Sequence, residues 1–139
     1  MKSEYIEIKE LNTDGYLPVI SYGEWRVAQL RFCEDLLIEN IRTMQKHEET
    51  DEVFVLLKGE GMLFTGGRFD RVDDVSCVRL EPLKLYNVKK GVWHNHVISE
   101  DATVLIIENE NTSDDNSPIQ ELNMKEQDMV KLLFEKNRW

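Results

Sequence analysis

Short apolar or alternating runs, separated by turn residues, fill most of the chain between residues 5 and 108. Runs of this length bounded by pairs such as Asp14-Gly15 and Gly66-Gly67 are typical of β-strands. Many short strands at this spacing indicate an all-β sandwich or barrel, not a βαβ fold. We expect strands over residues 5–8, 25–32, 36–44, 52–58, 62–65, 75–80, 84–88, 92–98 and 103–108.

Near the C-terminus the spacing of apolar residues changes from that of strands to that of a helix. Residues 109–121 are mostly polar and rich in turn formers, which predicts a loop. Asn123 can cap a helix, and Glu126 stands at the reciprocal capping-box position. An apolar stripe then follows at helical spacing: Met129, Val130, Leu133 and Phe134. We therefore predict a β-barrel over 1–108, a polar loop over 109–121 and a helix over 122–139. The helix either packs on the barrel within one domain or is reserved for a partner protein.

Length and charge narrow the function classes. A chain of 139 residues fits one domain and can bury enough surface to fold without disulfides. The chain has 27 acidic and 17 basic residues and a formal net charge of -10. Such acidity opposes contact with nucleic-acid phosphates and with anionic membranes. We therefore expect neither nucleic acid nor a membrane as a partner.

The cysteines and the N-terminus bear on the cellular compartment. Cys33 and Cys77 stand in apolar, strand-like surroundings and form no CxxC motif, so they predict neither a zinc finger nor a redox centre. The first residues show no apolar signal segment, and no apolar run approaches the ~20 residues of a membrane helix. We expect a cytoplasmic protein.

All three histidines fall into two short segments. His47 precedes Glu52 by five residues, and His94 and His96 lie some forty residues later. Divalent metals such as zinc or iron bind imidazole nitrogen together with carboxylate oxygen. His47, Glu52 and His94 are therefore candidate metal ligands. Gln45 shares the strand parity of His47, so its amide oxygen is a candidate fourth ligand.

These segments resemble the two conserved motifs of the cupin superfamily. In the first segment, His47, Glu52 and Gly59 match the motif's second histidine, glutamate and closing glycine. In the second segment, Gly91 and His94 match the glycine and the histidine. The chain also departs from both motifs: Gln45 replaces the first histidine, Lys89 the proline and Ile98 the asparagine.

The resemblance implies a cupin-type jelly-roll barrel or sandwich with a C-terminal α-helix. It also implies a divalent metal (Zn, Fe, Mn or Ni) held by Gln45, His47, Glu52 and His94, and a homodimer as the usual assembly. Cupins that have lost their metal work as isomerases or as binding modules, so Gln45 leaves metal binding open.

Three residues are candidates for proton transfer. His96 shares a strand face with His94, Glu49 lies in the acidic turn before residue 52, and Tyr86 lies near the second motif. The resulting hypothesis is a metal-dependent lyase, isomerase or dioxygenase acting on a small oxygenated metabolite (a sugar acid, keto acid or ureide). The alternative is a non-catalytic cupin that binds or senses a small molecule.

Overall fold

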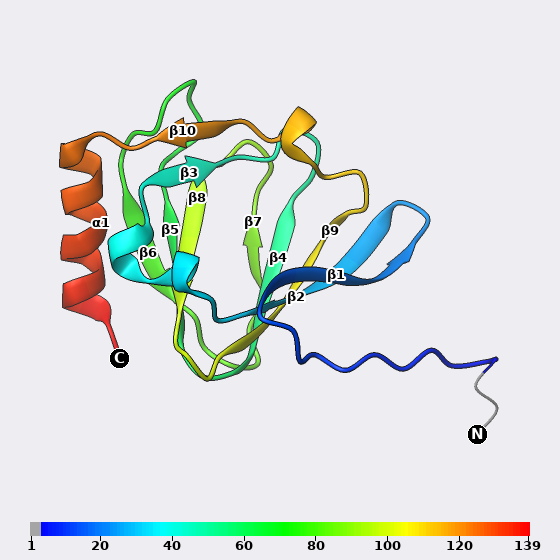
Figure 1. The fold of residues 1–139 in the computed structure, drawn as a ribbon. Helices are drawn as coiled ribbons and strands as arrows, with labels where there is room; N and C mark the ends of the chain where they lie inside the picture. Colours follow the sequence, from blue (N-terminus) through cyan, green and yellow to red (C-terminus); the bar gives the residue numbers. More distant parts are fainter. Residues whose placement is uncertain (1–3) are drawn as a thin grey trace.

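The computed structural model describes residues 4–139, in which the chain forms two antiparallel five-stranded sheets. Figure 1 shows the two sheets as layers that enclose the interior, with a helix beside the second sheet. The first sheet has the strand order β1-β2-β9-β4-β7 and the second β10-β3-β8-β5-β6. This architecture confirms the predicted all-β cupin-type sandwich with a C-terminal helix. Residues 1–3, where the predicted barrel domain begins, lie outside the described part.

The bounds of the regular elements are as follows: β1 (Gly15–Tyr22), β2 (Trp25–Arg31), η1 (Glu34–Leu36), η2 (Ile38–Asn40), β3 (Thr43–Gln45), β4 (Glu52–Lys58), β5 (Gly61–Thr65), β6 (Ser76–Arg79), β7 (Tyr86–Val88), β8 (His94–Ile98), β9 (Thr103–Asn109), η3 (Asp114–Asn116), β10 (Ile119–Glu121) and α1 (Met124–Asn137).

In strands β4 and β9 of the first sheet, every second side chain is buried and faces the interior of the sandwich. In β4, every second residue is buried, beginning with Glu52 and continuing through Phe54 and Leu56. In β9 the buried residues are Val104, Ile106 and Glu108. Successive side chains of a strand point to opposite faces, so each strand contributes its apolar residues to the core and one acid to the same inner face.

Gly59 closes the turn between β4 and β5. Its φ of +79° lies in the left-handed region, and an added Cβ would meet the backbone of Ala102 at 2.5 Å. Only glycine satisfies both constraints. The closing glycine of the first motif is therefore required by the packing of this turn.

Two predicted strands differ from the structure. The strand predicted over residues 5–8 is absent, and the strand predicted over 36–44 is broken into η2 and the three-residue β3. The side chain of Asn40 donates to the carbonyl of Glu34 at 2.7 Å and stabilises the tight turns there. The sequence pattern also missed β1 and β10. β1 is an edge strand that contains Pro18, and proline is tolerated at sheet edges.

Helix α1 begins as predicted. The side chain of Asn123 accepts a hydrogen bond from the amide of Glu126, and the Glu126 carboxylate accepts one from the amide of Asn123. Val130 and Phe134 are buried against the second sheet in the core cluster that contains Met44. In residues 4–139 no helix has the length and apolarity needed to cross a membrane.

We predict that Phe134→Ala lowers the free energy of unfolding by about 3–5 kcal/mol, because it leaves a cavity between α1 and the second sheet. Leu132→Ala is the matched control on the same helix, since Leu132 is 47% exposed; we expect it to cost under ~1 kcal/mol. Urea unfolding of both variants measures the difference. Equal losses would mean that the helix does not depend on this contact.

Candidate metal site

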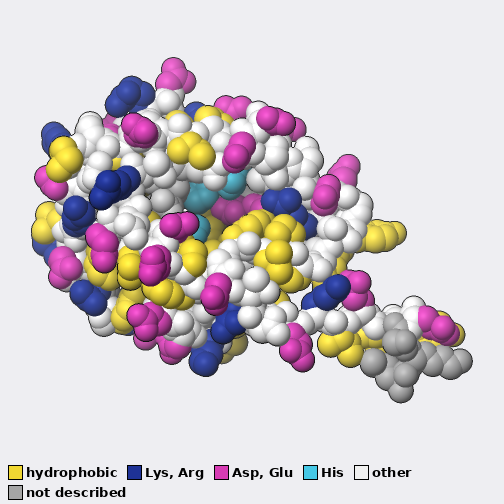
Figure 2. Space-filling view, viewed as in Figure 1, with side chains coloured by type: hydrophobic (Ala, Val, Ile, Leu, Met, Phe, Trp, Pro, Cys, Tyr) yellow, Lys and Arg dark blue, Asp and Glu magenta, His cyan; other side chains and the backbone are white. Residues whose placement is uncertain are grey.

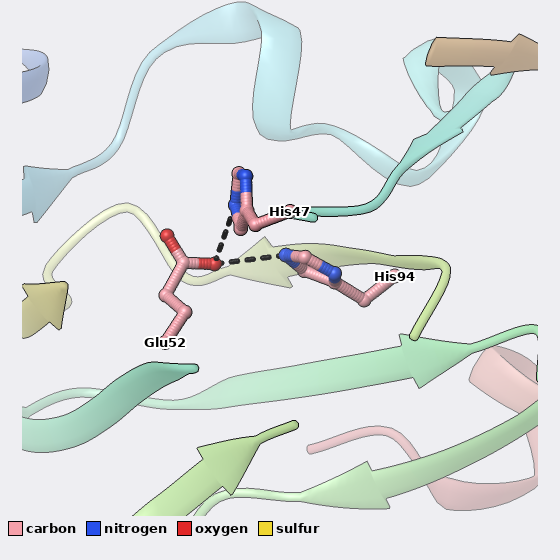
Figure 3. Close-up of side chains that lie close together, drawn as sticks. All are labelled: His47, Glu52 and His94. Atoms are coloured by element: carbon pink, nitrogen blue, oxygen red, sulfur yellow. Dashed lines mark hydrogen bonds and ion pairs between the residues drawn. The ribbon is translucent and has the colours of Figure 1, made fainter. Parts of the chain in front are cut away.

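Three side chains from separate segments of the chain converge at one point (Figure 3). His47 lies just after β3, Glu52 is the first residue of β4, and His94 is the first residue of β8. Nε2 of His94 lies 2.8 Å and Nε2 of His47 3.3 Å from Oε1 of Glu52. All three side chains are buried, and their ligand atoms lie within 4.8 Å of one another. The structure thus brings together the three residues that the sequence singled out.

Backbone contacts hold the two motif segments together. Gln45 of β3 is paired with His94 of β8, and the amide of Gly91 donates to the carbonyl of His47 at 2.7 Å. Gly91 has a φ of +80°, a conformation that side-chain-bearing residues rarely adopt. This glycine lets the chain turn into β8 beside His47, which fixes the spacing of the two imidazoles.

The hydrogen bonds of the outer ring nitrogens determine the tautomers. Nδ1 of His94 lies 2.9 Å from the carbonyl oxygen of Val92, which only accepts, so Nδ1 carries a hydrogen. Nδ1 of His47 lies 2.7 Å from Oγ of Ser117, and this hydroxyl donates to Oδ1 of Asn116 at 3.1 Å. Nδ1 of His47 is therefore also the donor. In the neutral ring this leaves Nε2 as an unprotonated acceptor on both histidines, directed at Glu52.

Two acceptor nitrogens and a carboxylate oxygen repel one another unless a cation lies between them. Burial alone raises the pKa of Glu52, but its interactions with His47 and His94 outweigh burial and hold the pKa well below its usual value. Burial lowers the pKa of His94, yet Glu52 raises it above its usual value. The site therefore needs positive charge, which either a proton on His94 or a metal ion supplies.

The donor set fits a divalent metal. Two ligand atoms bound to one ion at about 2.1 Å lie about 3.0–3.4 Å apart for angles between about 90° and 110°. The two separations from Oε1 of Glu52, 2.8 and 3.3 Å, are close to this range. Both imidazoles also have the Nδ1 hydrogen bonds that orient histidine ligands in metal proteins.

A cavity of about 380 Å³ opens onto these residues. Figure 2 shows the histidines at the bottom of a hollow, with acidic and basic side chains beside them. The walls combine polar groups with an aliphatic surface made by Leu30, Ile106 and Ile119. A cavity of this size suits a small ligand.

Gln45 lines this cavity, but its amide is already in use. Nε2 of Gln45 donates to the carbonyl of Ser117 at 2.9 Å. The amide oxygen is therefore the atom of this side chain that is left for a metal or a ligand.

His96 also lines the cavity, with Nδ1 buried and without a hydrogen-bond partner in the described residues. Burial lowers the pKa of His96 to about 4, so its imidazole is neutral at pH 7.

The structure does not bring Glu49 and Tyr86 to the cavity. Glu49 is exposed, and its carbonyl accepts a hydrogen bond from Asn109. The hydroxyl of Tyr86 accepts a hydrogen bond from the amide of Glu81 at 2.9 Å. Neither residue lines the cavity walls. Nearness in sequence to the motifs therefore did not translate into nearness to the ligand atoms.

A second acid, which the sequence analysis missed, lies beside Glu52. Val53 of β4 pairs with Ile107 of β9, so Glu52 and Glu108 face each other at the next position in register. Burial, together with neighbouring Glu52, raises the pKa of Glu108 to about 7. Its Oε1 accepts hydrogen bonds from Tyr16 at 2.5 Å and from Nη2 of Arg26 at 2.8 Å. The available signal was parity, because Glu108 continues the inward series of β9.

Sequence comparisons give no relative: no family model and no curated protein matches the chain. Solved structures do match. Hydroquinone 1,2-dioxygenase from Sphingomonas sp. TTNP3 is 11% identical, with 73% of this chain and 70% of that chain covered and a TM-score of 0.55. The TDP-fucose-3,4-ketoisomerase WlaRA from Campylobacter jejuni is 16% identical, with 81% and 73% covered and a TM-score of 0.54. A cupin-2 domain containing protein from Shewanella frigidimarina NCIMB 400 is 16% identical, with 78% and 90% covered and a TM-score of 0.48.

Two facing five-stranded sheets carry the motif residues to one point, and the matching solved structures share the fold of these sheets. The chain has the cupin fold. At these identities the likeness concerns the fold alone. The fold explains why the segment after β3 and the first residues of β4 and β8 supply the three ligand atoms, since these three positions lie side by side in the structure.

We predict that Glu108→Gln changes the pH dependence of stability. The folded-state pKa of Glu108, about 7, lies above its ordinary value of 4.5. The folded protein thus holds a proton that the unfolded chain releases, and wild type loses stability as the pH rises from about 4.5 to about 7. Glutamine removes this loss, so the variant gains stability relative to wild type between pH 5 and pH 8.

Urea unfolding at both pH values measures the effect. Glu110→Gln, which removes an exposed carboxyl two residues further along, is the control and should follow wild type. A constant difference between Glu108→Gln and wild type from pH 5 to pH 8 contradicts the assignment of this proton.

Proposed function

We propose that this chain is a metal-dependent cupin enzyme that acts on a small oxygenated metabolite by proton transfer. The candidate substrates are a sugar acid, a keto acid or a ureide. One observation carries the proposal: His47, Glu52 and His94 direct their ligand atoms at one buried point next to a cavity. A purely structural role would not require two buried acceptor nitrogens to face a carboxylate.

The proposed metal is Zn, Fe, Mn or Ni, held by His47, Glu52 and His94 with the amide oxygen of Gln45 as a fourth ligand. When bound, a divalent ion supplies Lewis-acid stabilisation of negative charge that develops on a substrate oxygen. The outer hydrogen bonds from the histidines to Val92 and Ser117 keep both rings oriented for this role.

Two cavity residues are suited to moving protons. A group transfers protons best when its pKa lies near the working pH. Glu108, with a pKa of about 7, fulfils this condition and is oriented by Arg26 and Tyr16. His96 presents a neutral imidazole that accepts or donates a hydrogen bond at the cavity wall. We propose these two residues, in place of Glu49 and Tyr86, as the proton-transfer groups.

Metal content tests the proposal most simply. We expect the protein, purified without a histidine tag and equilibrated with a divalent salt, to bind about one ion per chain. His47→Ala and His94→Ala should each lower the metal content by at least about tenfold, because each removes one of three strong ligands. Elemental analysis and the accompanying circular dichroism spectrum check both the loss and the retention of the fold.

His96→Gln is the matched control, since it changes the third histidine but none of the proposed ligands. We expect it to keep the metal content of wild type. If wild type binds no divalent ion at micromolar concentrations, the metal-dependent function fails and the alternative, a metal-free binding cupin that uses the same cavity, replaces it.

We further propose a cytoplasmic homodimer. β1 is an edge strand of the first sheet, so one row of its backbone groups has no strand partner within the described chain. The extended segment 5–12 lies next to it in sequence and runs away from the body (Figure 1). Ile6 and Ile8 in this segment are 54% and 68% exposed. An extended segment that carries the exposed Ile6 and Ile8 is complementary to an open edge strand of a second copy.

The free thiols of Cys33 and Cys77 suit a reducing compartment.

We predict that light scattering after gel filtration gives twice the chain mass of 16.4 kDa. The double variant Ile6→Lys, Ile8→Lys should elute as a monomer, because it places charge in the proposed contact. Lys9→Glu, in the same segment, is the control for a general effect of altered charge. A monomeric wild type at 100 μM rules out the dimer.

A further inference from the structure

The charges that line the cavity restrict the ligand more narrowly than the proposed function does. This inference rests on that function, because it concerns the same cavity. Apart from the histidines, Arg26 is the one cationic side chain of residues 4–139 that lines the cavity walls. Against it stand three carboxylates: Glu52, Glu108 and Asp114. The walls therefore carry two excess negative charges when all three acids are ionised.

Arg26 has little capacity left for an anionic ligand. Nε and Nη2 donate to Oε1 of Glu108, at 3.3 and 2.8 Å. Nη1 donates to the carbonyl of Glu110 and Nη2 also to that of Thr112, at 3.0 and 3.1 Å. These bonds occupy four of the five N–H groups of a guanidinium. The arginine serves the wall itself, so a carboxylate or phosphate of a ligand would find no free cation here.

When Glu108 is ionised, a divalent ion at the three ligands would cancel the two excess charges and leave the loaded cavity neutral. A ligand that brings its own negative charge would then lie uncompensated near Glu108 and Glu52. Burying an unpaired charge costs far more than burying a neutral polar group. Electrostatics alone therefore favours an uncharged ligand.

Hydrogen bonding gives the same answer from a separate observation. Many side-chain donors of the wall already donate within the protein: Tyr16 to Glu108, Gln45 to Ser117, Asn95 to Thr43, Thr112 to Asn109 and Ser117 to Asn116. Acceptors remain, among them the amide oxygen of Gln45 and the carboxylate of Asp114 at the rim. Thr43, Ser113 and His96 can still donate, but with Glu52, Glu108 and Asp114 also in the wall its acceptors prevail. Such a wall pairs best with a ligand that is rich in N–H or O–H groups.

We propose that the ligand of this cavity is an uncharged, donor-rich molecule, such as a neutral sugar, a polyol or a neutral ureide, and not a sugar acid or a keto acid. Its hydroxyl or N–H groups donate to the acceptors of the wall. Its carbon skeleton packs against the aliphatic surface of Leu30, Ile106 and Ile119. The cavity of about 380 Å³ accommodates a molecule of this size.

Matched ligand pairs test this class. D-glucose and D-glucuronate differ only by a hydroxymethyl group in place of a carboxylate, as do D-galactose and D-galacturonate; allantoin and allantoate form a ureide pair. Each is titrated into ¹⁵N-labelled, zinc-equilibrated protein while the amide shifts of Thr43, Asn95 and His96 are followed. We expect the neutral member of at least one pair to bind at least about tenfold more tightly than its anion. The inference is overturned if the anion binds equally or more tightly in every pair that binds, or if no neutral member shifts these amides at 50 mM.

A charge variant supplies the second arm. Glu108→Gln removes a negative charge and leaves the Arg26 guanidinium without its carboxylate partner, so the preference for the neutral member should shrink to about twofold or reverse. Glu110→Gln, an exposed change outside the cavity walls, should keep the wild-type ratio. An unchanged ratio in Glu108→Gln contradicts the role of the wall charges.

Zinc content is measured on the same samples, which separates the two proposals. Protein that holds neither zinc nor another divalent ion and still prefers the neutral members refutes the metal-dependent function and leaves this inference standing. Protein with stoichiometric zinc that prefers the anions does the opposite.

Discussion

The buried carboxylate of Glu52 is the interaction on which the site depends. An ionised carboxylate away from water is stable only when positive charge and hydrogen-bond donors surround it. Here the nearest groups are Nε2 of His47 and Nε2 of His94, at 3.3 and 2.8 Å. The hydrogens of both rings are held at Nδ1 by Val92 and Ser117. The protein thus builds a cluster that is complete only with a proton or a metal ion at its centre.

The same constraint extends across the first sheet. Arg26 of β2 is paired with Glu108 of β9, and Glu108 faces Glu52 of β4. Like charges directly opposite each other destabilise a sheet. Arg26 compensates the charge of Glu108, and His94 compensates that of Glu52. Glu108, between them, is the acid that retains its proton most readily. Metal binding, proton transfer and ligand charge are therefore linked through one row of side chains.

Much of the secondary structure could be predicted from the sequence because its signals lie in neighbouring residues. Strands β2, β4, β8 and β9 lie close to their predicted ranges, since period-two alternation and turn residues mark them clearly. Helix α1 followed from its capping box and apolar stripe. The pattern failed at the edges, where burial is slight. β1 is mostly exposed and contains a proline, and the exposed residues 6–8 alternate like a strand without forming one.

The site was predictable where a motif marked it. His47, Glu52 and His94 could be named because their spacing matched the cupin motifs, and the structure brings them together. Glu108 and Arg26 carry no motif, and their place depends on the register of three strands, which one sequence does not give. Glu49 and Tyr86 lie near the motifs in sequence, but a turn and a different hydrogen-bond partner keep them outside the cavity.

The most direct measurement is a crystal structure of the protein grown with zinc, with data collected at the zinc absorption edge. We predict one strong anomalous peak within about 2.3 Å of Nε2 of His47, Nε2 of His94 and a carboxylate oxygen of Glu52. Well-ordered crystals that bind zinc elsewhere, with no peak among these three atoms, would contradict a zinc centre at this cluster and leave a proton as the charge that completes it.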